Sequence, residues 1–156
     1  MDASQRLSMD FPSRPPKQIA VTDLHRDAFG IEPLEVWQSR DLLVMLESEA
    51  QIKELKANLS KIAEITDSFA VIATAKGDKV DFVSRFFAPN AGIPEDPVTG
   101  SAHCTLVPFW ADKLGKQTLQ AKQLSPRGGE LFCINKGARV SMSGYATLFM
   151  KAEIYV

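Results

Sequence analysis

The chain has 156 residues, of which 45% are hydrophobic and 24% are charged. This length fits one compact domain, and this composition excludes a disordered or fibrous chain. With 18 basic and 19 acidic residues the net charge is −1, so no general positive field attracts nucleic acid or acidic lipid. The longest apolar run, residues 69–75, contains Thr74 and is far shorter than a membrane span. We therefore expect a globular protein that binds neither nucleic acid nor a membrane.

The N-terminus and the cysteines bear on the compartment. Residues 1–6 lack the apolar core of a secretion signal, so we expect a cytoplasmic location. Cys104 and Cys133 stand in no Cys-x-x-Cys or Cys/His ligand spacing. We interpret both as reduced thiols, which predicts neither a zinc site nor a disulfide.

The first residues predict a strand followed by a break. Apolar and polar residues alternate over residues 7–11, a pattern typical of a half-buried strand, and Pro12 then ends the ladder. We interpret residues 1–11 as the remnant strand of a first half, residues 12–18 as a proline-rich linker and residues 19–156 as a single domain. A strand and a linker with so little before them suggest a missing partner.

Caps, turns and apolar spacing predict the middle of the chain. In order, they indicate a helix at 23–29, strands at 35–39 and 42–47, a helix from Ser48 onward, and a strand hairpin at 68–75 and 80–88. Thr22 caps the first helix, on which we expect His25 to be exposed. In the second helix, Ile52, Leu55 and Leu59 share one face.

The C-terminal part predicts one long helix among strands. The pattern indicates, in order, a loop at 89–97, a helix at 99–114 ended by Gly115, and strands at 118–124, 130–135, 139–144 and 147–156. Pro108 removes one backbone hydrogen bond from that helix and predicts a kink. Strands around one long helix indicate the α+β class, with a mixed or antiparallel sheet curled around a central helix.

The segment with the clearest chemistry is residues 88–102. Glu95 and Asp96 place two carboxylates in a loop that Pro94 and Pro97 make rigid, so these side chains lose little conformational freedom on binding. Such carboxylates are candidates for proton transfer.

The start of the following helix suits an anion. Thr99, Gly100 and Ser101 present backbone N–H groups there, and the positive end of the helix dipole favours a substrate carboxylate. An acid beside such donors is what proton transfer next to a carboxylate needs. The alternative is structural, because Asp96 or Thr99 can simply cap the helix. The residues alone leave both interpretations open.

Other side chains near this segment also carry two interpretations. His103 can donate to a ligand or shuttle a proton, or it can be a satisfied core histidine. Cys104 near the helix start can be a reactive thiol or a small buried one. Arg85 can approach a ligand carboxylate, or it can pair with Glu95 or Asp96.

Several motifs together resemble the PhzF-like phenazine-biosynthesis family. The similar segments are residues 81–89, 92–103 and 124–129. The string Glu-Asp-Pro-Val-Thr-Gly-Ser-Ala at 95–102 is the most specific of them. Residues 9–12 resemble the place where the family's first half ends.

This resemblance implies a fold and an activity. The fold is that of diaminopimelate epimerase, in which two similar halves face one another across a cleft, and this chain would be one half. Members of the family work without a cofactor or metal and isomerise a small carboxylate-bearing metabolite by moving a proton. By motif position, Asp96 would be the catalytic acid. The residues that would bind substrate are Gly100, Ser101, Thr99 and His103, the last of which matches the motif's histidine.

The family's first half supplies a catalytic glutamate and a histidine-containing segment that have no counterpart in this sequence. We therefore expect either a homodimer or a separate N-terminal-half chain to complete the cleft. The alternative function is a catalytically incomplete domain that binds small anions or serves in assembly.

Overall fold

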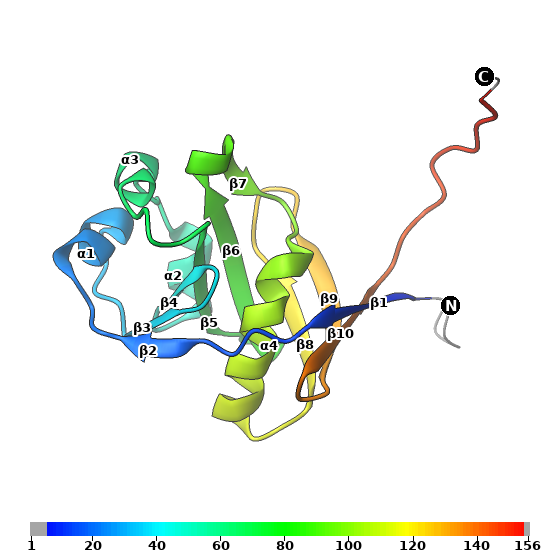
Figure 1. The fold of residues 1–156 in the computed structure, drawn as a ribbon, viewed down its shortest axis with the longest axis horizontal. Helices are drawn as coiled ribbons and strands as arrows, with labels where there is room; N and C mark the ends of the chain where they lie inside the picture. Colours follow the sequence, from blue (N-terminus) through cyan, green and yellow to red (C-terminus); the bar gives the residue numbers. More distant parts are fainter. Residues whose placement is uncertain (1–5, 155–156) are drawn as a thin grey trace.

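The computed structural model describes residues 6–154 and shows one large mixed sheet with helices on both faces (Figure 1). The strands are β1 (Leu7–Pro12), β2 (Lys17–Ile19), β3 (Glu35–Gln38), β4 (Leu42–Met45), β5 (Val71–Lys76), β6 (Phe82–Ala88), β7 (Ile93–Asp96), β8 (Thr118–Gln123), β9 (Gly129–Asn135) and β10 (Arg139–Gly144). Their order is β1-β10-β9-β8-β6-β5-β4-β3-β2, with β7 beside β6. The pairs β4–β5 and β6–β8 are parallel and the others antiparallel.

Side-chain alternation divides the sheet between two cores. The helices are α1 (Asp23–Phe29), α2 (Glu49–Glu54), α3 (Leu59–Ala63) and α4 (Gly100–Leu114). Leu43, Ile72 and Phe82 pack with α4 on one face. Their strand neighbours Val44 and Val83 point the other way and pack with α1, α2 and α3. Because successive strand residues face opposite sides, one run of apolar residues serves both cores.

The sheet curls around α4, which confirms the predicted architecture. Its two outermost strands on this path, β1 and β2, are separated by residues 13–16 alone. Four residues span no more than about 18 Å, so the two edges come close to one another. Trp37 on β3 packs edge-to-face on Phe109 of α4, with ring centroids 5.4 Å apart. The opposite side of the sheet, β9 and β10, also contacts α4.

The linker between β1 and β2 compensates for the proline in α4. Pro108 has no N–H to donate to the carbonyl of Cys104, four residues earlier. The backbone N–H of Arg14 donates to that carbonyl instead, at 2.8 Å. α4 therefore continues through Pro108 until Gly115, which adopts a left-handed conformation with φ of 63°.

His25 is buried, so the expectation of an exposed histidine was wrong. Thr22 caps α1 as predicted, and its hydroxyl accepts from the backbone N–H of His25. The Nδ1 atom of His25 in turn accepts from the backbone N–H of Thr22 at 3.1 Å. The imidazole thus takes the place that Glu or Gln usually occupies in a capping box, and burial lowers the pKa of His25.

The single helix expected from Ser48 onward is two short helices. Ser48 caps α2 as predicted, but Leu55 is extended, with ψ of 121°, and ends that helix. Asn58 then caps α3 through its side chain. Leu59 is consequently 37% exposed rather than on the buried face. The loop expected at 89–97 also differs, because it contains a 3-10 turn, Pro89–Ala91, and strand β7.

The strand predicted at 147–156 does not form over residues 147–154. Residues 155–156 lie outside the described part of the chain. Residues 145–154 have no regular structure and run away from the sheet (Figure 1). Their large apolar side chains are exposed, namely Tyr145, Leu148, Phe149, Met150 and Ile154. A strand needs a neighbouring edge for its backbone hydrogen bonds, and this segment has none in the described structure. Among the described residues, no helix has the length and apolar character to cross a bilayer.

Candidate functional site

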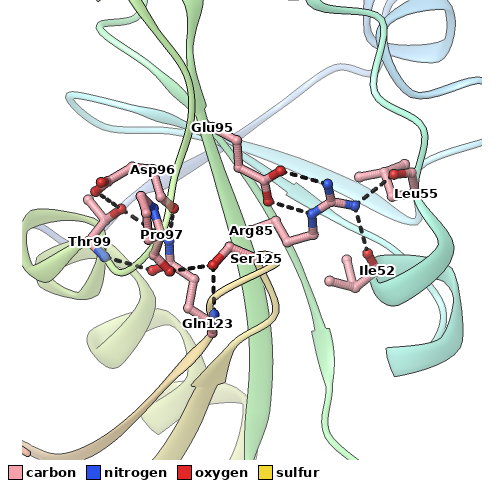
Figure 2. Close-up of polar contacts among 10 residues, drawn as sticks. Ile52, Leu55, Arg85, Glu95, Asp96, Pro97, Thr99, Gln123 and Ser125 are labelled. Atoms are coloured by element: carbon pink, nitrogen blue, oxygen red, sulfur yellow. Dashed lines mark hydrogen bonds and ion pairs between the residues drawn. The ribbon is translucent and has the colours of Figure 1, made fainter.

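The candidate site lies where β7 leads into α4. Asp96 is the last residue of β7 and pairs with Phe86 of β6. Thr99, the N-cap of α4, donates its hydroxyl to Oδ2 of Asp96 (Figure 2). The Asp96 side chain is half-buried. The structure therefore places the predicted acid directly beside the helix start.

Gln123, at the end of β8, stabilises this turn through hydrogen bonds of its side-chain amide. Its Oε1 atom accepts from the backbone N–H of Thr99 at 2.8 Å, and its Nε2 donates to the carbonyl of Asp96 at 2.7 Å (Figure 2). Ser125 donates its hydroxyl to the carbonyl of Pro97 at 2.7 Å. Sequence reasoning missed Gln123. A buried glutamine in an otherwise apolar inward row is the signal that identifies it, because such an amide needs partners.

Gly129 lets β9 approach the same turn. A Cβ atom at this position would lie 2.5 Å from a methyl group of Val98. Such a contact is far closer than packed carbon atoms allow. The tight turn before β9 and the turn before α4 are thus packed against each other, which supports the position of Asp96.

The first turn of α4 has no side-chain cap. Thr99 has extended dihedral angles, yet its hydroxyl bonds to Asp96 and not to a helical N–H. The capping interpretation of Asp96 and Thr99 is therefore wrong for their side chains. A Cβ built on Gly100 would meet nothing within 4 Å, so no neighbouring element packs against this side of the residue. The amides of Gly100 and Ser101 and the helix dipole together favour a bound anion.

Ser101 receives a hydrogen bond from an arginine that sequence reasoning missed. Nη2 of Arg40 lies 3.1 Å from Oγ of Ser101. Arg40 also pairs with Asp41, whose side chain is 1% exposed. Arg40 lies in the turn between β3 and β4, some 60 residues from Ser101 in the sequence. Local spacing carries no signal of such a contact.

Glu95 forms a structural ion pair within the fold. Its carboxylate accepts two hydrogen bonds from Arg85, at 2.7 and 2.8 Å (Figure 2). Nη1 of Arg85 also donates to the carbonyls of Ile52 and Leu55, at 3.3 and 2.7 Å. Of the alternatives for Arg85, pairing with Glu95 is the one observed. Asp96 is thus the carboxylate of this pair that remains for chemistry.

His103 lies inside the fold, beneath the site. Its side chain is fully buried, and its Nδ1 is 2.8 Å from the carbonyl of Thr99. Because a carbonyl only accepts, Nδ1 carries the proton. Burial lowers the pKa of His103 to about 4, so the ring is neutral at pH 7. His103 is therefore a core histidine, but its Nε2 atom has no hydrogen-bond partner among the described residues, so the ring is only partly satisfied.

Both cysteines are buried thiols. Burial raises the pKa of Cys104 and raises the pKa of Cys133 to about 12. A protonated, inaccessible thiol is a poor nucleophile. The described residues contain no group of three or more His, Cys, Asp or Glu side chains arranged to hold a metal ion.

Known proteins are similar to this chain in sequence and in fold. The chain is 46% identical over 151 residues to an uncharacterized isomerase of Pseudomonas aeruginosa, a match that covers 96% of this chain and 58% of that protein. A crystal structure of a phenazine biosynthesis protein of the PhzF family from Enterococcus faecalis matches with a TM-score of 0.93 and 40% identity, covering all of this chain and 60% of that one. A putative phenazine biosynthesis PhzC/PhzF protein from Clostridium difficile matches with a TM-score of 0.88 and 41% identity, over 97% of this chain and 59% of that one.

The chain therefore spans about three-fifths of the length of these relatives. The match includes the turn from β7 into α4 on which the site depends. The family model described as phenazine biosynthesis-like protein, PhzC-PhzF, matches residues 5–152. The chain thus belongs to the phenazine biosynthesis-like (PhzC-PhzF) family.

Proposed function

We propose that this chain has an isomerase-type function, in which Asp96 transfers a proton on a small carboxylate-bearing metabolite held by Gly100 and Ser101. The observation that carries the proposal is the position of Asp96, whose carboxylate is tied to the helix start through the Thr99 hydroxyl. Relatives from Pseudomonas aeruginosa and Halalkalibacterium halodurans that are named isomerases support the reaction class.

The geometry gives the two carboxylate oxygens of Asp96 and the helix amides different roles. Thr99 occupies Oδ2 of Asp96, and Oδ1 accepts no hydrogen bond from the described residues. Oδ1 is thus the atom that takes a proton from carbon next to the substrate carboxylate and returns it at another carbon. Negative charge then develops on the substrate carboxylate. The amides of Gly100 and Ser101, with the helix dipole, stabilise that charge without having to reorganise.

A second protein surface would complete the cleft. Phe69, whose ring lies under Arg40, is an exposed apolar side chain beside the site, and so is Ile93 at the start of β7. Exposed apolar side chains around a polar site are typical of a covered surface. We infer that another copy of this chain, in a homodimer, or a separate N-terminal-half chain covers them.

The second candidate function is an incomplete domain that binds small anions or serves in assembly. The engagement of Glu95 and His103 in structural contacts favours this candidate. The two candidates share the anion site and differ in whether Asp96 exchanges a proton.

Proton exchange in deuterated water separates the two candidates. A panel of small amino and hydroxy acids is incubated with the protein, and deuterium incorporation is followed by NMR. We expect incorporation with at least one acid, and a loss of about 10²–10⁴-fold in Asp96→Asn, because a positioned acid–base group contributes that much. Asp27→Asn, which changes an exposed carboxylate of α1, is the control and keeps the rate. Exchange that persists in Asp96→Asn overturns the role of Asp96, and no exchange with any acid supports the incomplete domain.

A further inference from the structure

Three side chains form a polar cluster at the edge of the candidate site. Arg40 donates from Nε and Nη2 to the two oxygens of Asp41, at 3.0 and 2.8 Å. The same Nη2 atom donates to Oγ of Ser101 at 3.1 Å. The cluster thus joins the β3–β4 turn to the first turn of α4.

Arg40 is held in place on two sides. The Asp41 side chain is 1% exposed, and the Arg40 side chain is 34% exposed. The guanidinium carbon lies 4.9 Å from the ring centroid of Phe69. A buried carboxylate needs its charge partner, and a bidentate pair fixes the plane of the guanidinium. Arg40 therefore has a defined orientation before any ligand arrives.

This orientation determines what the Ser101 hydroxyl can do. A guanidinium has donors only, so Oγ of Ser101 accepts from Arg40. The single hydroxyl proton then points away from Arg40, and within the described part of the chain it has no acceptor. Beside the Gly100 and Ser101 amides, the cluster thus presents the Ser101 hydroxyl as a donor, which is the complement of a carboxylate.

We propose that Arg40 is the positioning residue of the substrate-carboxylate site: held by Asp41, it turns the Ser101 hydroxyl into a fixed donor. This inference rests on the proposed function, because it concerns the same anion site. Asp41 acts only through Arg40, and Arg40 acts through Ser101.

The experiment titrates the ¹⁵N-labelled protein with sodium acetate at constant ionic strength and follows the backbone amides of Gly100 and Ser101. We expect saturable shifts in the unchanged chain. Ser101→Ala and Arg40→Gln each raise the Kd about tenfold, as expected for one hydrogen bond to a charged ligand. The double variant loses no more than either single one, because the two residues act as one unit. Arg40→Lys restores part of the affinity.

The control is Arg139→Gln, which removes another partly exposed, ion-paired arginine, the partner of Asp10 between β10 and β1, and leaves the Kd unchanged. Should Arg40→Gln fail to fold because Asp41 is left unpaired, the variant Arg40→Gln/Asp41→Asn removes that charge and carries the same expectation. An unchanged Kd in Arg40→Gln, or losses that add in the double variant, overturns the positioning role and leaves the anion site intact. An absence of saturable shifts in the unchanged chain overturns the anion site itself, and with it this inference.

Discussion

His103 and Asp96 show that the motif predicts the order of the residues around the helix start but not the burial of each side chain. The order of residues 95–103 places two acids, three small residues and a histidine around a helix start. It does not say which side chains turn inward. In the structure, His103 falls on the buried side of α4, whereas Asp96 is only half-buried, in a turn that Thr99 and Gln123 stabilise. That difference depends on β8, which approaches from far along the chain.

His103 makes the stability of the protein depend on pH. Its pKa is about 4 in the folded protein and near 6.5 when exposed, so the unfolded state binds more protons between these values. The free energy of unfolding therefore falls as pH drops from 6.5 towards 4, by about 3 kcal/mol, and the loss levels off below that.

Urea denaturation at pH 7 and pH 4 measures this effect. His103→Gln removes its contribution, so the difference in stability between the two pH values shrinks in that variant. His25→Gln is the companion variant, because burial lowers the pKa of His25 in the same direction. An unchanged pH dependence in His103→Gln contradicts the assignment of a buried neutral imidazole.

At the level of elements, periodicity and caps located most helices and strands, but not the break between α2 and α3. Ile52, Leu55 and Leu59 fit one continuous helix equally well. The break is tertiary, because the backbone N–H of Asn58 donates to the carbonyl of Ala28 in α1. The sequence also did not predict strand β7, because Pro94 argues against a strand. Proline is tolerated there because β7 has a single strand neighbour, β6.

The Arg85–Glu95 pair connects three elements, β6, β7 and α2. The two side chains are 13% and 19% exposed, so the pair is shielded from solvent. Glu95→Gln leaves the guanidinium without a charge partner, and we expect a loss of about 2 kcal/mol in the free energy of unfolding. Chemical denaturation measures this loss. Glu64→Gln, which breaks an exposed pair with Lys61, is the control with little effect. Equal losses in both variants contradict a structural role for Glu95.

On the scale of the whole molecule, the sequence predicted a sheet around a helix but not the strand order. The antiparallel neighbours β3–β4 and β8–β9 follow from short turns. The parallel pair β6–β8 and the position of β1 beside β10 do not, because they join segments far apart in the chain. Composition and periodicity indicated only the class, and the resemblance to a known family implied the type of fold without these strand pairings.

The proposed second copy is tested by the mass of the protein in solution. We expect light scattering to give a dimer at micromolar concentration. Ile93 is 45% exposed beside the site and Ile134 is 41% exposed on β9. Ile93→Ser therefore weakens the dimer, and Ile134→Ser, a matched change on another strand, does not. A strict monomer contradicts the homodimer.

The pairing of β1 with β10 also bears on how the chain is made. Leu7 pairs with Gly144, and Pro12 pairs with Arg139, so the two partners are well over a hundred residues apart. During synthesis, β1 leaves the ribosome long before its neighbour exists, and an unpaired edge strand is prone to aggregate. Helix α4 emerges earlier than β10, and its Cys104 carbonyl is already free to receive Arg14. The hydrogen bond from Arg14 to Cys104 thus offers the segment that contains β1 a first anchor while β10 is still to be translated.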